Sequence, residues 1–288
     1  MMRTALLLGM AGALCAQYAA GQYNAGRKPL GAAAQGGLPA YLQHAGIDQN
    51  LNQALPLTAS FNDESGAVVP LGKYFQHRPV MMALVYYKCG MLCPQVLHGM
   101  ANSLKGTGFT VGKDYEVVVT SFDPTDTPAE SLSKKQQFVG WMGNPADTSG
   151  IHFLTGSQAS IDALTQAVGF HYVRVPGPDG KMDQFAHSSV IMIATPDGRL
   201  SKYLSGIQYP SRDIRLSLVE ASDHKIGKLS DLVLIYCCNY SPSTGKYTVS
   251  ILHVLSIAGV ITIFVVIGII FLMTRKPGGR NIPPGATA

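Results

Sequence analysis

The chain has 288 residues, of which 47% are hydrophobic and only 14% are charged. Because a soluble globular protein carries about 25% charged residues, this composition indicates apolar segments outside an ordinary core and excludes a disordered, highly charged tail protein. The formal net charge of +5, from 22 Lys and Arg against 17 Asp and Glu, is too small to indicate nucleic-acid binding.

The N-terminus has the pattern of a secretory signal peptide. A positive charge precedes a short apolar stretch at residues 5–14, and small residues at 19–21 offer a cleavage site. Cys15 follows a residue that is too large for a usual lipid attachment site. We therefore predict a signal peptide at 1–21, followed by a flexible leader at 22–56 that is rich in Gly, Ala, Gln and Pro.

From residue 57 the pattern changes to that of an alternating α/β domain. Residues 57–69 predict a hairpin, and the continuous apolar run at 79–86 is typical of a fully buried strand. A helix is expected to begin at Pro94, because proline suits the first helical position. Further along the chain we predict a strand at 115–122, a helix from 128 to about 139, a short strand at 151–154, a helix at 157–168, a hairpin at 189–204 and a helix at 212–221. These elements predict one α/β domain at residues 57–222 with an added N-terminal hairpin.

The C-terminal region predicts a membrane anchor. After a polar connector at 223–250, residues 251–273 contain no charged side chain, are long enough to cross a bilayer and precede Arg275 and Lys276. The alternative is a buried core helix, which this length and the basic residues after it disfavour. By the positive-inside rule the tail at 274–288 stays in the cytoplasm, and the domain lies outside it.

Cys89 and Cys93 lie between the predicted buried strand and the following helix, where α/β folds place ligands. A helix N-terminus lowers the pKa of a thiol, and two thiolates at this spacing can form a disulfide or bind one soft metal ion. The spacing is one residue wider than the C-x-x-C redox motif, which favours a metal over dithiol exchange. The alternative of two inert thiols is disfavoured by their position and by the exported compartment.

A metal held by two cysteines needs further ligands, and the chain has eight histidines. We favour His187, because it lies just before a predicted buried strand and therefore at a loop mouth. His98 lies about one and a half helical turns beyond Cys93, where a solvated or otherwise satisfied histidine is the more common outcome. His77 and His152 have no such context.

Three segments together resemble the Sco/SenC copper chaperones of cytochrome c oxidase assembly. The sequence YYKCGMLCP at 86–94 resembles the metal loop of that family. The sequence SFDPTDTP at 121–128 resembles its D-P-x-x-D-T-P segment with one residue fewer, and DQFAH at 183–187 resembles its histidine segment. Their order and approximate spacing agree with the family over residues 57–221.

The resemblance implies a thioredoxin-like fold that binds copper, as Cu(I) or Cu(II), through Cys89, Cys93 and His187. It implies delivery of copper to cytochrome c oxidase subunit II, or reduction of that subunit's cysteines by Cys89 and Cys93 as redox-active thiols. Other copper carriers or thiol reductants would be further partners. Asp123 matches an acid near the family's site, where it would steer the ligands or a partner, and it is equally a turn or helix-capping residue. With the predicted anchor, the domain would lie on the periplasmic side of a bacterial inner membrane.

The chain also departs from the family pattern. Gly90, Met91 and Leu92 replace the common Pro-Asp-Val between the cysteines, and Met91 would offer either a thioether to Cu(I) or an apolar loop contact. Many members are anchored at the N-terminus, whereas the anchor predicted for this chain is C-terminal, and its connector resembles that of bacterial members anchored in this way. Cys237 and Cys238 are adjacent, so a disulfide between them would be strained; they pass copper, pair between chains or remain free thiols.

Two functions of different classes follow from these residues. The favoured one is a membrane-tethered copper metallochaperone, which is not an enzyme. The alternative is a metal-independent thiol–disulfide oxidoreductase of exported proteins that uses Cys89 and Cys93. Peroxide reduction is a third class, but no residue indicates a peroxidatic site.

Overall fold

The computed structural model describes residues 44–177, 179–223, 238–241, 246–249 and 251–274. The predicted signal peptide, the predicted leader up to residue 43, Cys237 and the tail after Thr274 lie outside the described residues.

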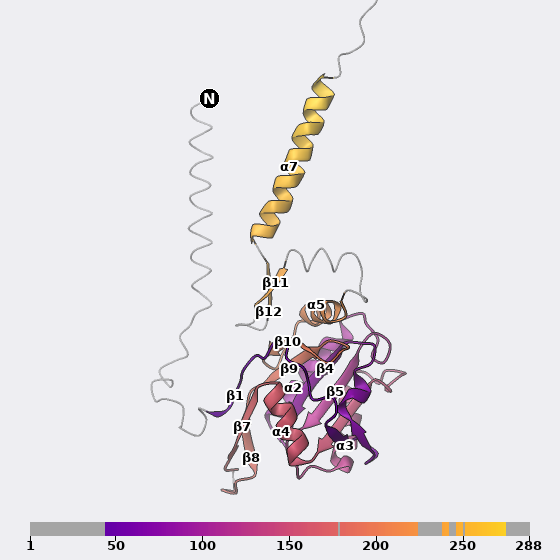
Figure 1. Ribbon diagram of the computed structural model, residues 1–288, viewed down its shortest axis with the longest axis vertical. Coiled ribbons are helices and arrows are strands. Elements are labelled where there is room, and N and C mark those ends of the chain that lie inside the picture. The colour runs from indigo at the N-terminus through magenta and orange to yellow at the C-terminus, as the bar shows by residue number, and fades with distance from the viewer. Residues whose placement is uncertain (1–43, 178, 224–237, 242–245, 250, 275–288) are drawn as a thin grey trace, which may run out of the picture. The chain divides into compact units, whose positions relative to one another are not determined.

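A seven-stranded mixed sheet runs through the domain (Figure 1). In the order in which they lie side by side, its strands are β10 (Leu200–Ser205), β9 (Val190–Ala194), β4 (Val80–Val85), β5 (Glu116–Ser121), β6 (Ile151–Gly156), β2 (Ser60–Asn62) and β3 (Val68–Pro70). Strands β4, β5 and β6 are parallel, and the other neighbours are antiparallel. The predicted α/β class is confirmed, and β2 and β3 form the predicted hairpin, which joins the sheet through β6.

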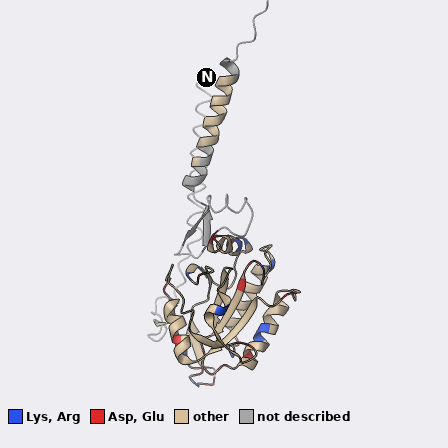
Figure 2. Cartoon of the chain, turned by 45° about the vertical axis from the view of Figure 1, so that its right-hand side comes forward, with Lys and Arg blue, Asp and Glu red and all other residues tan. Residues whose placement is uncertain are grey.

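The core forms around the central strands. Strand β4 is buried along its whole length, as its continuous apolar sequence predicts, and most of the sheet carries no charged residue (Figure 2). Four helices pack on the domain: α2 (Leu92–Lys105), α3 (Pro128–Trp141), α4 (Gln158–Ala167) and α5 (Ser211–Ala221). Strands β4 and β5 pair in register from Val80 opposite Glu116 to Val85 opposite Ser121, so the loops that follow them emerge at the same edge.

Helix α2 begins earlier than the sequence predicted. We expected Pro94 at the first helical position, but the helix starts at Leu92 with Met91 as its N-cap. Pro94 is therefore the third helical residue, which is tolerated because a backbone nitrogen in the first turn has no intrahelical acceptor. As a result, Cys93 lies within the first turn of α2.

A second sheet, of three antiparallel strands, was not predicted. Its order is β1 (Gly46–Ile47), β7 (Phe170–Val175) and β8 (Gln184–His187). His187 lies just before the buried strand β9, as predicted, but it ends strand β8 instead of lying at a loop mouth. The cross-strand partner of His187 is Tyr172 of β7, and this pairing fixes where the histidine emerges.

The predicted leader extends too far along the chain. Residues 46–47 pair with β7, and Leu55 is buried in the core although it falls within the predicted leader at 22–56. Burying this apolar side chain is favourable, which draws the end of the leader onto the domain.

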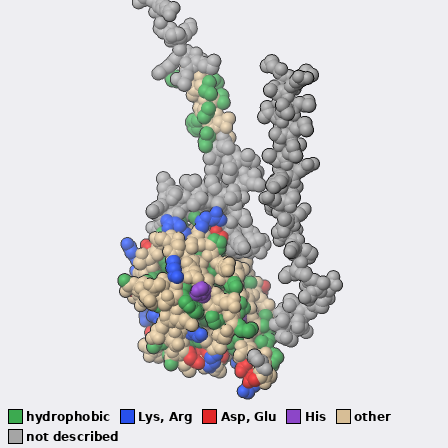
Figure 3. Space-filling model, turned by 180° about the vertical axis from the view of Figure 1, so that it is seen from behind, with side chains coloured by type: hydrophobic (Ala, Val, Ile, Leu, Met, Phe, Trp, Pro, Cys, Tyr) green, Lys and Arg blue, Asp and Glu red, His purple; other side chains and the backbone are tan. Residues whose placement is uncertain are grey.

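The C-terminal region contains a hairpin and a helix. Strands β11 (Cys238–Ser241) and β12 (Lys246–Val249) pair within the predicted connector. Helix α7 (Ile251–Thr274) follows, and its described side chains are mostly hydrophobic (Figure 3). Judged by length and hydropathy over the described residues, no helix qualifies as a membrane span, so the transmembrane helix predicted at 251–273 is not supported.

Candidate functional site

The two cysteines lie at the edge of the sheet where β4 and β5 end. Cys89 follows β4, and Cys93 occupies the first turn of α2. Both are free thiols and both are buried, with 6% and 2% of their surface exposed. His187 reaches the same place from the end of β8, 94 positions further along the chain than Cys93.

Cys93 and His187 are in direct contact. The distance between Cys93 Sγ and His187 Nε2 is 3.4 Å, and His187 Nδ1 lies 2.9 Å from the backbone oxygen of Ser188. Because a carbonyl oxygen only accepts hydrogen bonds, Nδ1 carries the proton and Nε2 presents its lone pair to the sulfur. This tautomer is the one that binds a metal through Nε2.

Aromatic rings enclose the imidazole. The ring centroids of Phe122, Phe170 and Tyr86 lie 5.2, 5.7 and 6.2 Å from that of His187. All three residues are at most 3% exposed. Burial lowers the pKa of His187, which keeps the ring neutral and available as a ligand.

The two thiols differ in their electrostatics. The hydrogen bond from the Cys93 thiol lowers the pKa of Cys89 to about 4, against the opposing effect of burial. Further hydrogen bonds from the Tyr86 hydroxyl and from the backbone N–H groups of Cys93 and Met91 act in the same direction. The pKa of Cys93 is raised above its ordinary value, because its thiol proton is held by Cys89 and because it is buried. The pair therefore carries one thiolate, at Cys89.

Sequence reasoning missed Tyr86 as a residue of the site. Its hydroxyl has two acceptors within reach of its single proton, Gln184 Oε1 at 2.9 Å and the Cys89 sulfur, so it contacts both the cysteine loop and the strand that carries His187. Burial raises the pKa of Tyr86, so the hydroxyl stays protonated. The available signal was its position at the end of the buried run, three residues before Cys89.

Asp123 takes the role of a turn residue. Its Oδ1 accepts hydrogen bonds from the backbone N–H and the hydroxyl of Thr125, at 2.9 and 2.8 Å. Helix α3 is capped by Thr127 and Glu130, which form a capping box. Asp123 therefore stabilises a turn, and it does not cap helix α3.

A second buried acid at this edge of the sheet, Asp126, was not singled out by the sequence. Its Oδ2 accepts from the backbone N–H of Tyr87 and from the Ser121 hydroxyl, both at 2.6 Å. Its Oδ1 lies 3.5 Å from Lys88 Nζ. These contacts join the segment after β5 to the residues just before Cys89. The signal that was available is its place in the D-P-T-D-T-P segment.

Cys89, Cys93 and His187 have the donor atoms that suit a soft metal ion, although the three side chains are not close enough together to coordinate one. Within the described part of the chain, no three His, Cys, Asp or Glu side chains are grouped closely enough to hold a metal. Cys93 contacts His187 and hydrogen-bonds Cys89, so a shared ion would require Cys89 and His187 to draw closer together. Two sulfurs and a neutral imidazole are nevertheless the ligands that copper prefers.

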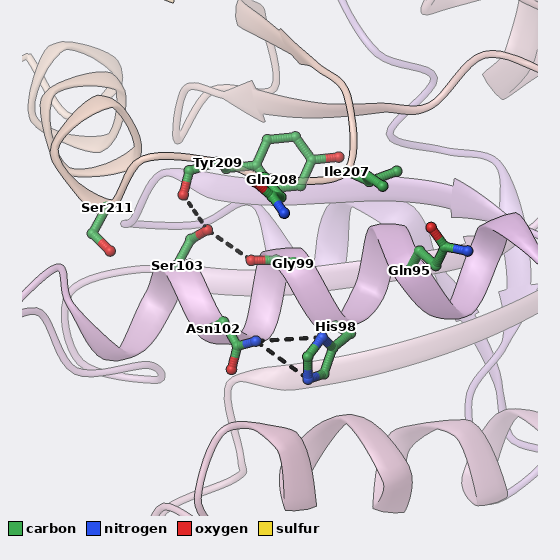
Figure 4. A pocket seen from close by; sticks show the side chains of 9 residues that line it. All are labelled: Gln95, His98, Gly99, Asn102, Ser103, Ile207, Gln208, Tyr209 and Ser211. Carbon is green, nitrogen blue, oxygen red and sulfur yellow. Dashed lines mark hydrogen bonds between the residues drawn. The ribbon is translucent and has the colours of Figure 1, made fainter.

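Two cavities in the described part of the chain lie away from the cysteines. One of about 470 Å³ is formed between α2 and the segment before α5, and His98, Asn102 and Tyr209 are among its lining residues (Figure 4). Another of about 340 Å³ is lined by residues such as Arg78, Glu116 and His152. None of the predicted ligands lines either cavity.

Comparisons with known proteins agree with this arrangement. The family model described as SCO1/SenC matches residues 59–218. A crystal structure of a candidate electron transfer protein from Aquifex aeolicus VF5 is 20% identical, with a TM-score of 0.53 over 61% of this chain and 96% of that one. That likeness shows a shared fold.

Other structures are similar at lower scores. Arabidopsis thaliana ScoI with copper bound is 19% identical, with a TM-score of 0.47 over 56% of this chain and 94% of that one. BsSco, described as a member of the Sco family of cytochrome c oxidase assembly proteins, is 24% identical, with a TM-score of 0.44 over 62% of this chain and 99% of that one. A comparison with curated proteins gave no match.

Proposed function

The chain belongs to the SCO1/SenC family, and from this premise we propose that it binds copper as cargo and serves the assembly of cytochrome c oxidase. The ligands would be Cys89, Cys93 and His187. The copper, as Cu(I) or Cu(II), would be carried and handed on rather than used in a reaction.

The contact between Cys93 Sγ and His187 Nε2, at 3.4 Å, carries this proposal. It places a neutral imidazole lone pair against a thiol that in turn hydrogen-bonds a second thiol. Two soft sulfurs with one nitrogen select copper over the harder divalent ions. The aromatic rings around His187 would keep water from the bound ion.

The ligand set is tested by measuring how many copper ions each chain of the purified full-length protein binds. Cys237 and Cys238 are replaced by serine throughout, so that only the proposed site can hold copper. We expect one copper ion per chain, lost in Cys89→Ser and in His187→Ala. His98→Ala is the matched control, because His98 is a histidine of α2 that lines a separate cavity. Full copper occupancy in His187→Ala would refute the ligand set.

The electrostatic difference between the thiols supports a second candidate function, thiol–disulfide exchange without metal. The Cys89 thiolate would attack a substrate disulfide, forming a mixed disulfide and releasing one substrate thiolate. Cys93, after losing its proton, would attack Cys89 and release the second. The protein would end with a Cys89–Cys93 disulfide, and the substrate would gain two electrons, one proton from Cys93 and one proton from solvent.

His187 separates the two functions. Disulfide exchange needs only the cysteines, so the His187→Ala variant should reduce a model disulfide at the parental rate if this second function holds. Rapid exchange by a parent protein that retains no copper would favour the oxidoreductase.

The proposal has two further parts. Subunit II of the oxidase receives the copper, and residues 251–273 tether the chain to a membrane. The sequence supports the tether, because residues 251–273 carry no charged side chain and basic residues follow them. The domain would then face the periplasm of a bacterial inner membrane. We expect the full chain to stay with membranes after alkaline carbonate extraction, and a chain ending at residue 250 to be released. Release of the full chain would contradict the tether.

A further inference from the structure

Met91 is left uncovered beside two buried thiols. The sequence allowed either an apolar loop contact or a free thioether at this position. In the structure 78% of Met91 is exposed, the largest fraction for any large hydrophobic residue of the described chain. Its side chain therefore does little packing, and the apolar-contact alternative is not what the structure shows.

The backbone holds Met91 at the mouth of the site. A single residue separates it from each cysteine, so its Cα lies within about 7.6 Å of both cysteine Cα atoms. Its backbone N–H donates to the Cys89 sulfur. A Cβ on Gly90 would meet nothing within 4 Å, so the loop beside Met91 is open.

Met91 occupies a position that usually holds a helix-capping side chain. It is the N-cap of α2 and makes no capping hydrogen bond, like Pro210 at α5, whereas Thr127 caps α3 and Ser157 caps α4 through their side chains. Departures from such local rules concentrate at functional sites.

The proposed copper ligands are themselves largely buried. Cys89 and Cys93 are 6% and 2% exposed, and His187 is enclosed by aromatic rings. A carrier or acceptor therefore meets the exposed Met91 side chain more readily than the largely buried sulfurs. A flexible thioether is a soft donor that binds Cu(I).

Resting on the proposed copper function, we propose that Met91 is a transient ligand that takes Cu(I) in and out of the Cys89–Cys93–His187 site. A bond between copper and the Met91 thioether forms as one bond to the buried donors breaks. The metal remains Cu(I), and the step is ligand exchange without electron transfer.

The test uses the full chain with Cys237 and Cys238 replaced by serine and its methionine methyl groups labelled with ¹³C. Cu(I) is supplied anaerobically and then removed by a small chelator in a stopped-flow experiment. The variants are Met91→Leu, which keeps the apolar shape, and Met182→Leu, a control at another exposed methionine. A small chelator removes copper without docking on the protein surface. A slower rate of copper removal in Met91→Leu therefore cannot come from a lost docking contact.

We expect the parent and both variants to bind one copper ion. Copper removal should be slower by on the order of tenfold in Met91→Leu and unchanged in Met182→Leu. The NMR signal of the Met91 methyl group should shift or broaden during Cu(I) exchange, and that of Met182 should not. Parental exchange rates in Met91→Leu, or an unaffected Met91 methyl signal, would overturn the inference while leaving the copper site standing. Absence of copper from the parent would overturn the proposed function and this inference with it.

Discussion

The carboxylate of Asp126 has no exposed side-chain surface and holds together the two loops that build the site. Its Oδ2 accepts from Tyr87 and Ser121. Removing these acceptors would leave a buried backbone N–H and a hydroxyl unpaired, at a cost of about 1–3 kcal/mol for each group. An amide at this position retains an oxygen acceptor without the buried charge.

Substituting Asp126→Asn should change how stability depends on pH. Burial raises the pKa of Asp126, so its protonated form is favoured in the folded state. The associated stability is present below the unfolded carboxyl pKa and is lost as pH rises through the folded pKa. Urea unfolding between pH 3 and pH 8 should show the parent losing stability relative to Asp126→Asn as pH rises. A relative gain for the parent would mean that hydrogen bonds and Lys88 outweigh the burial of the charge.

The reactivity of Cys89 should reveal its thiolate. The pKa of Cys89 is lowered chiefly by the hydrogen bond from Cys93, so alkylation of the reduced, metal-free protein should vary little between pH 6 and pH 9. In Cys93→Ala the midpoint of the pH–rate profile should move up towards the ordinary thiol pKa of about 8.5. The midpoint is compared instead of the absolute rate, because a thiolate with a lower pKa is also a weaker nucleophile. The two effects partly cancel in the rate but not in the midpoint. Peptide mapping by mass spectrometry separates Cys89 from the other cysteines, and an unchanged midpoint would contradict the assignment.

At the scale of elements, α2 is held against the segment that leads into α5. The Ser103 hydroxyl lies 2.7 Å from the backbone oxygen of Gly99 and 2.5 Å from that of Tyr209 (Figure 4). A Cβ on Gly99 would overlap the backbone oxygen of Ile207. The missing side chain therefore sets how closely α2, which carries Cys93, approaches the rest of the domain.

Two glycine substitutions make a matched pair. Gly99→Ala should destabilise the protein by about 1–3 kcal/mol, because the clash is with backbone and cannot be relieved by a side chain. Gly140→Ala in α3 meets nothing within 4 Å and should be neutral or stabilising by about 0.5 kcal/mol. Chemical denaturation of both variants measures the difference. Equal effects would show that helix propensity, and not the close approach, sets the outcome at Gly99.

The elements that the sequence predicted correctly are those with strong local patterns. The apolar run of β4 and the capping serine of α4 each identify their element without tertiary information. By contrast, β8 has only four residues and burial along β7 does not alternate cleanly, so neither strand has a strong local pattern. Strand β7 also pairs with β1, which lies more than 120 positions earlier in the chain. The cysteines could be found from their spacing, whereas the contact of His187 with Cys93 follows from a pairing that no local pattern specifies.

Considered as a whole, the site joins the two sheets of the domain. Cys89 and Cys93 belong to the β4–α2 connection of the seven-stranded sheet, and His187 ends a strand of the three-stranded sheet. The contacts of Tyr86 with Gln184 and of Cys93 with His187 cross between them. A metal ion bound by all three ligands would add a further link between the sheets.

Copper should therefore raise the thermal stability of the whole domain, and His187 should be needed for the full effect. A ligand that binds only the folded state at about 100 times its Kd adds about 2.7 kcal/mol, which for a domain of this size raises the Tm by about 5–10 °C. Scanning calorimetry with and without Cu(I) should show this rise in the parent and a much smaller one in His187→Ala. The apo form of that variant gives the baseline, since losing the imidazole alters stability by itself. If copper raises the Tm of His187→Ala as much as that of the parent, the ion binds through the cysteine loop alone and does not link the two sheets.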